Sequence, residues 1–141
     1  MFTRNRKLSV VRLGLILALL GGMLGAMPVP VVHAATLIVT NNNSSGAGSL
    51  SQIINNASPG DTITFDPSLS GATIAFYSKS LTKNITIDAT NLSLPVTLDG
   101  GGLTQLFQIT SGITVELKNI VLTNGYYNGL GGTVNNQGTL K

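Results

Sequence analysis

In residues 95–125, PVTLDGGGLTQLFQITSGITVELKNIVLTNG, short apolar runs alternate with clusters of glycine and asparagine. Runs of this length, rich in Val, Ile, Leu and Thr, are typical of short β-strands bounded by turns. Similar runs recur along the chain, with 22 residues separating Ile85 from Phe107 and 24 separating Leu98 from Leu122. Self-similarity at about 20 to 25 residues indicates a solenoid, in which each coil buries its apolar face against the next.

Comparable runs stand on both sides of this stretch. ATLIVTN, DTITFD, ATIAFY and NITIDA precede it, and GTVNNQG and TLK follow it. Short strands also build sandwiches and barrels, so the repeat spacing is what favours a parallel β-helix. We predict an all-β fold with an amino-terminal cap over residues 35–66 and coils over residues 67–141.

One segment, GSLSQIINNASPGD at residues 48–61, has a helical pattern. Its apolar residues are Leu50, Ile53, Ile54 and Ala57. Their i, i+3, i+4, i+7 spacing places them on one helix face. Ser49 and Gln52 have the spacing of a capping box, and Pro59 predicts the end of the helix. The first coil of a solenoid exposes its interior, so we expect this helix to act as a lid; a plain surface helix is the alternative.

The first 34 residues are typical of a signal peptide. Basic residues precede an apolar run at residues 13–27, and Val32 and Ala34 occupy positions −3 and −1 of a cleavage site between Ala34 and Ala35. An uncleaved anchor is the alternative, although prolines and glycines weaken the run as a spanning helix. We expect a bacterial protein that is secreted or lies at the cell surface, where the outer membrane is one location considered. It would contact a membrane only through this segment.

Cleavage would also remove most of the positive charge. The formal charge of the whole chain is +3, but the part after residue 34 holds four lysines against five acidic residues, a net charge of −1. This part contains neither arginine nor histidine, and the whole chain has no cysteine. The composition therefore argues against nucleic-acid binding, disulfides and metal ligation by His or Cys.

A resemblance is carried by four motifs in order. They are LIVTNNNSSGAGSLSQIINNASPGDTITFD, LTKNITIDA, FQITSGITVELKNIVLTNG and GGTVNNQGTLK. Together they resemble the amino-terminal part of bacterial right-handed parallel β-helix repeat proteins, exported surface proteins akin to the polymorphic outer-membrane and filamentous-adhesin-like groups. The resemblance covers residues 36–141 and implies a single-stranded, right-handed β-helix of the pectin-lyase-like fold. Such proteins often have Arg after GSL, where this chain has Ser51. An ion pair from that position, which would hold the lid in place, is therefore not expected here.

Polysaccharide lyases and hydrolases share the fold that the resemblance implies, and a fold alone does not establish activity. Lyases of this architecture usually combine a calcium-binding carboxylate cluster with an Arg or Lys base, and the hydrolases use paired carboxylates, typically with a His. Asp88 and Asp99 come nearest to such a pair. They either share a calcium or catalytic site or, as we favour, each caps the turn that ends its strand. We predict no catalytic residue, cofactor or metal.

The segment NGYYNG, residues 124–129, has the character of a binding loop. Adjacent exposed aromatic rings such as Tyr126 and Tyr127 stack on sugar faces or anchor a protein partner. The alternative is a loop in which one tyrosine packs against the coil. We expect a glycan or a cell-surface protein as the partner, if these residues bind one.

These features favour an exported, non-catalytic cell-surface or adhesin-like β-helix module. The alternative is the amino-terminal part of a polysaccharide lyase or hydrolase whose active site lies in further coils. NNQGTLK stops within a predicted strand, so we expect a fragment truncated at the carboxyl end. An open last coil would favour self-association.

Overall fold

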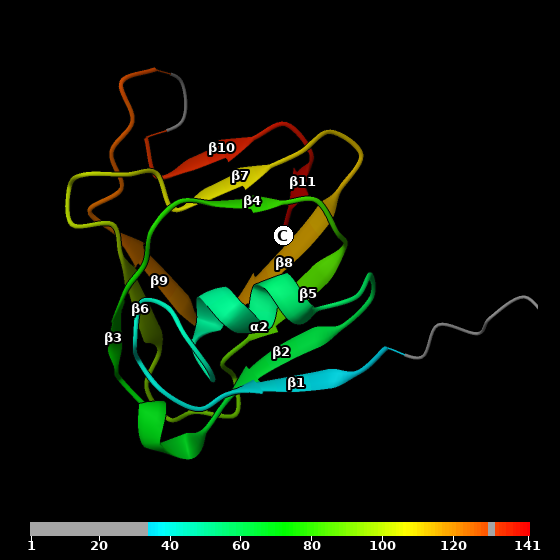
Figure 1. The fold of residues 1–141 in the computed structure, drawn as a ribbon, viewed down its shortest axis with the longest axis vertical. Helices are drawn as coiled ribbons and strands as arrows, with labels where there is room; N and C mark the ends of the chain where they lie inside the picture. The colour runs from blue at the N-terminus through cyan, green and yellow to red at the C-terminus, as the bar shows by residue number, and fades with distance from the viewer. Residues whose placement is uncertain (1–33, 130–131) are drawn as a thin grey trace, which may run out of the picture. The chain divides into compact units, whose positions relative to one another are not determined.

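The computed structural model describes residues 34–129 and 132–141, and in them the chain forms a parallel β-solenoid with one short α-helix (Figure 1). Three parallel sheets form its sides, and from Thr62 onward the chain visits them in turn, whereas the helix lies between the first two strands. This confirms the predicted all-β solenoid. The predicted signal peptide, apart from Ala34, lies outside the described residues.

The strands are short, as the sequence predicts. Sheet A contains β1 (Thr36–Val39), β2 (Thr62–Phe65), β5 (Ile85–Asp88), β8 (Thr114–Lys118) and β11 (Thr139–Leu140). Sheet B contains β3 (Thr73–Ala75), β6 (Val96–Asp99) and β9 (Ile120–Thr123). Sheet C contains β4 (Lys79–Leu81), β7 (Phe107–Ile109) and β10 (Val134–Asn136). The helix is α2 (Leu50–Asn56), and a 3-10 turn, η1 (Pro67–Leu69), follows β2.

Apolar side chains of successive coils stack in register inside the solenoid. The sheet A ladder is Leu37, Ile63, Ile87 and Leu117, and the sheet B ladder is Ile74, Leu98 and Leu122. Between the sheets, the rings of Phe76 and Phe107 pack with their centroids 5.1 Å apart. Burial of one such side chain contributes about 1.5–3 kcal/mol, so the ladders are the main source of stability.

The coil repeat is longer and less regular than the sequence suggests. Leu98 pairs with Leu122 as predicted, but Ile85 pairs with Val115 and not with Phe107. The predicted equivalence of Ile85 and Phe107 is wrong because these residues lie in sheets A and C of the same coil. Paired positions are 24 residues apart between β2 and β5 and 30 apart between β5 and β8.

Helix α2 lies across the space that the three sheets enclose, at the end next to β1 (Figure 1). Leu50 and Ile54 on its inner face are buried in the main core. The Ser49 side chain accepts a hydrogen bond from the backbone N–H of Gln52, as the capping box predicts. The reciprocal bond is replaced, because the Ser49 N–H donates to the Gly46 carbonyl and the Gln52 amide donates to Asn56. The arrangement is that of the expected lid.

Lys83 binds the carboxyl end of the helix. The resemblance had left open which residue, if not one at position 51, would hold the lid in place. The Nζ of Lys83 donates to the carbonyl oxygens of Asn55 and Ala57, at 3.1 and 2.6 Å. A cation is favourable there because these carbonyls carry the negative end of the helix dipole. The cation thus comes from the following coil, and not from the position of Ser51.

Asparagine side chains join neighbouring coils by bonding to backbone groups. Asn91 and Asn119 donate to the carbonyls of Phe65 and Ala89, at 2.7 and 3.0 Å, and Asn84 accepts from the Thr114 N–H at 2.8 Å. Asn119 has a positive φ of 54°, which asparagine tolerates better than most residues. Each of these bonds spans 26 to 30 residues of sequence and therefore fixes the stacking of one coil on another.

The last described coil is less buried than those before it. Leu117, Leu122 and Val134 are only partly buried, and Leu140 is 36% exposed. Self-association through this end, and truncation of the chain, stay predictions.

Candidate functional site

The corner between sheets B and C changes most from coil to coil. It connects paired positions through residues 73–79 in the first coil, 97–107 in the second and 121–134 in the third. The segment thus lengthens along the solenoid while the sheets keep their register. Its longest loop carries the NGYYNG sequence.

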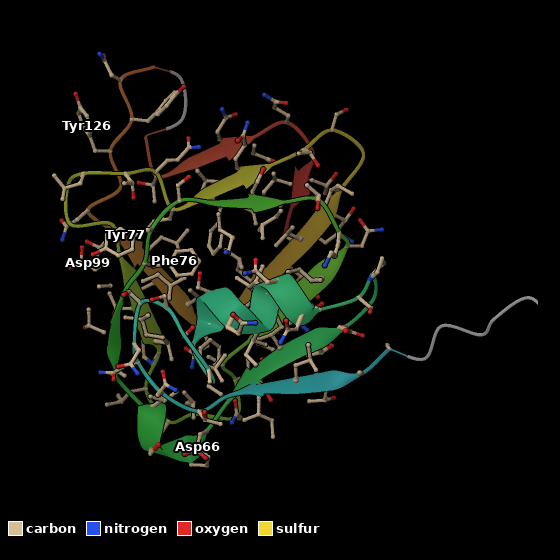
Figure 2. The ribbon with its side chains drawn as sticks, in the orientation of Figure 1. Asp66, Phe76, Tyr77, Asp99 and Tyr126 are labelled. Atoms are coloured by element: carbon tan, nitrogen blue, oxygen red, sulfur yellow. The ribbon has the colours of Figure 1, made fainter. Side chains whose placement is uncertain are left out.

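A cleft of about 400 Å³ lies at this corner, among the loops of three successive coils. Its lining residues are Ser78, Leu103, Thr104, Gln105, Tyr126, Tyr127 and Asn128. Tyr126 and Tyr127 are 55% and 50% exposed, and Leu103 is 76% exposed. Figure 2 shows Tyr126 on the loop after β9, directed away from the interior into which Phe76 points. The structure therefore places both predicted tyrosines at one accessible site, to which they contribute together with Leu103.

Backbone contacts fix the loops that carry these side chains. The Tyr126 N–H donates to the Thr104 carbonyl at 2.9 Å, and the Gly102 N–H donates to the Asn124 carbonyl at 2.8 Å. Gly100 permits this approach, because a Cβ there would lie 2.6 Å from the Asn124 oxygen. The two loops that line the cleft are thereby bonded to each other.

The ring of Tyr127 is partly packed, as the alternative interpretation of this loop predicts. A Cβ on Gly129 would lie 2.6 Å from Cε1 of Tyr127, so the ring lies directly against this glycine. The ring nevertheless stays half exposed. Tyr127 is positioned by its loop, and Tyr126 is the freer of the two.

Two polar groups at the cleft lack partners within the described part of the chain. Gln105 is 9% exposed, and neither its Oε1 nor the Thr104 Oγ1 has a hydrogen-bond partner there. Unpartnered buried polar groups are rare in native proteins and call for a specific explanation. The sequence pattern did not single out these residues, because the run TQLF lacks the alternation that would mark Gln105 as buried.

Asp88 and Asp99 each accept hydrogen bonds from the turn that follows their strand. Asp88 Oδ1 accepts from the N–H and hydroxyl of Thr90, and Asp99 Oδ1 accepts from the N–H of Gly101 and the amide of Asn124. Asp88 and Asp99 end strands of different sheets, A and B. Each carboxylate therefore closes its own turn, as the sequence analysis favoured.

These bonds also set the protonation of the carboxylates. Hydrogen bonds from Gly101 and Asn124 lower the pKa of Asp99. Burial raises the pKa of Asp88, but bonds from Thr90 and the charge of Lys118 outweigh it, so that this pKa is also lowered overall. Both groups are held as carboxylates, which suits acceptors of turn N–H groups.

Lys118 is the charged partner on the outer face of sheet A. Its Nζ lies 3.7 Å from Asp88 Oδ2 and 3.4 Å from Glu116 Oε2. Such partly exposed pairs contribute about 0–1 kcal/mol. Within residues 34–129 and 132–141, no three His, Cys, Asp or Glu side chains are grouped so as to hold a metal.

The predicted cleavage site lies at the beginning of the described chain. Ala34 and Ala35 are both exposed, and the Ala35 N–H donates to Asp61 Oδ1 at 2.8 Å. No helix among the described residues is long and apolar enough to cross a membrane. The apolar run at residues 13–27 lies outside them.

No protein-family model, curated protein or solved structure matches this chain. Membership of the β-helix surface-protein family and the pectin-lyase-like fold therefore stay predictions. The parallel β-solenoid itself rests on the strand pairing.

Proposed function

We propose that this protein is an exported, non-catalytic, adhesin-like surface module that binds a glycan in the cleft between sheets B and C. The observation that carries the proposal is the pair of half-exposed tyrosines, Tyr126 and Tyr127, in a cleft built by the loops of three coils. The signal-peptide pattern and the likeness to exported β-helix proteins of the pectin-lyase-like fold support it.

The chemistry of the cleft favours a neutral saccharide. None of its lining residues is charged, so it offers no ion pair to an acidic sugar or a phosphate. Aromatic faces pack against the C–H face of a sugar ring, and hydroxyl and amide groups exchange hydrogen bonds with its hydroxyls. Gln105 and Thr104 add two oxygens that have no hydrogen-bond partner in the described chain, although both atoms are buried.

Export and binding are tested separately. Bacteria expressing the full chain are fractionated and treated with protease, and we expect the protein outside the cytoplasm. Labelled protein is then applied to immobilised neutral and acidic glycans and to cells. We expect binding to neutral glycans and to cells that carry them. Binding to cells that survives enzymatic removal of their glycans would indicate a protein partner and overturn the glycan proposal.

The matched variants are Tyr126→Ala with Tyr127→Ala, and Tyr77→Ala as the control. Tyr77 is 56% exposed but does not line the cleft. Loss of one stacked aromatic contact costs about 0.5–1.5 kcal/mol beyond its buried area, so the double variant should bind at least about tenfold more weakly. Equal binding by the double variant and the control would refute a role for the cleft.

Catalysis is tested by incubating the purified protein with pectins and other acidic glycans, with and without Ca²⁺. The proposal predicts no turnover. Any turnover that copurifies with the chain would refute the proposal of a non-catalytic module and indicate a carbohydrate-active enzyme.

A further inference from the structure

Asp61 is a buried carboxylate at the junction of the first strand and the end of the helix. The residue is only 3% exposed. Oδ1 accepts from the Ala35 N–H at 2.8 Å, and Oδ2 accepts from the Ser58 N–H at 2.7 Å. Both oxygens therefore hold backbone groups, one of them at the predicted signal-cleavage site.

The surrounding backbone fixes Ala35 in this position. The Thr62 N–H donates to the Ala35 carbonyl at 2.9 Å, as the parallel pairing of Thr36 with Thr62 requires. Ala34 and Ala35 are both exposed residues at the start of the described chain. The nitrogen of Ala35, the atom that cleavage would free, is thus held against a carboxylate.

We infer that Asp61 is a binding site for the α-ammonium group that signal-peptide cleavage creates at Ala35, so that processing adds a partly buried ion pair to the cap. The inference rests on the proposed export. Hydrolysis consumes one water: its hydroxyl joins the Ala34 carbonyl carbon, its hydrogen joins the Ala35 nitrogen, and near neutral pH the products are a carboxylate and an ammonium. A neutral hydrogen-bond donor is thereby converted into a cation at the same 2.8 Å contact.

The electrostatic surroundings suit a cation at this position. Hydrogen bonds from Ser58 and Ala35 lower the pKa of Asp61, and burial, which raises it, does not reverse this. Lys83 is the other charged group that acts on Asp61, and it lowers the pKa further. Lys83 also donates to the helix carbonyls, so its ammonium is shared between the two groups. The new ammonium would give the Asp61 carboxylate a cation in direct contact with it.

The ion pair would act within a defined pH window. A carboxylate raises the pKa of an ammonium that it contacts, so this contribution is complete below the ordinary α-amino value of about 8 and is lost as the pH rises through the folded value. The contribution of the carboxylate to stability is lost as the pH falls through the lowered pKa of Asp61. Processing should therefore stabilise the protein most between about pH 4 and pH 8.

The experiment compares free and acetylated amino termini. The full chain is expressed with export, and sequencing of the exported protein should show Ala35 as its first residue. One half is acetylated at mildly acidic pH, where the α-amine reacts ahead of lysine because its pKa is lower. Acetylation restores an uncharged N–H like that of the unprocessed chain, which makes it the matched control. The same pair is prepared for Asp61→Asn.

We expect acetylation to lower the melting temperature by several degrees in the protein with Asp61 and to leave Asp61→Asn unchanged. An equal effect in both proteins, or none in either, overturns the inference while the export proposal stands. An exported protein that begins at another residue does the same. If Asp61→Asn fails to fold, NMR titration of the α-amine decides: a pKa above about 8 in the folded protein supports the ion pair, and an ordinary value refutes it.

Discussion

Replacing Lys83 by methionine should loosen the lid without changing the solenoid beneath it. Methionine keeps a long unbranched side chain but removes the ammonium that donates to the carbonyls of Asn55 and Ala57. Those two carbonyls then have no intrahelical partner and must turn to water. Helix α2 should open more often, and the buried Leu50 and Ile54 should be exposed more often with it.

The size of the effect follows from the two bonds. A hydrogen bond to a charged group contributes about 1.5–3 kcal/mol when it is buried. The bond to Asn55 is exposed and the bond to Ala57 is partly buried, so water replaces much of what is lost. We expect a loss of about 1–2 kcal/mol in total, which increases opening by roughly five- to thirtyfold.

Hydrogen exchange followed by mass spectrometry measures this opening in the peptide that contains α2, and urea unfolding measures the whole domain. Lys79→Met is the matched control, because Lys79 is also half-buried but its side chain makes no hydrogen bond or ion pair within the described residues. Faster exchange in α2 for Lys83→Met alone supports the reasoning. Equal exchange in the two variants would show that Lys83 does not hold the lid.

Two further predictions concern the core and the turns. Leu98→Ala, at a fully buried position, should lower the free energy of unfolding by about 2–5 kcal/mol, and Leu122→Ala on the same ladder should cost less because it is already partly exposed; equal urea midpoints would contradict this. The free energy of unfolding should also fall in acid, because four aspartates have pKa values below 3.8 in the folded chain and their contribution, complete above about pH 5, is lost as the pH falls through those values. The four are Asp61, Asp66, Asp88 and Asp99. Urea midpoints that do not change with pH in acid would count against it.

The sequence predicted the kind of fold better than the length of its coils. Short apolar runs and their turns identify strands because burial alternates along each of them, as in β5 and β6. The strand β4 was missed, since Leu81 is its only apolar residue. Coil length was misjudged because periodicity records apolar spacing alone, and the runs around Ile85 and Phe107 look alike although they belong to different sheets.

The candidate site was predictable only in part. The doubled aromatic in NGYYNG identified Tyr126 and Tyr127, since adjacent exposed rings are distinctive in a chain with few aromatic residues. Leu103 and Gln105 join them through loop bonds between coils, and no local pattern reports such contacts. The contact of Asp61 with Ala35 was not predictable, because it spans 26 residues of sequence.

The lengthening corner between sheets B and C has a practical consequence for engineering. The second coil accommodates a longer connection than the first, and the strands on either side still pair in register. Extra residues at this corner therefore leave the register of the flanking strands unchanged. A foreign peptide grafted into the loop around residue 102 would be displayed beside the loop of the next coil, to which Gly102 is hydrogen-bonded through Asn124.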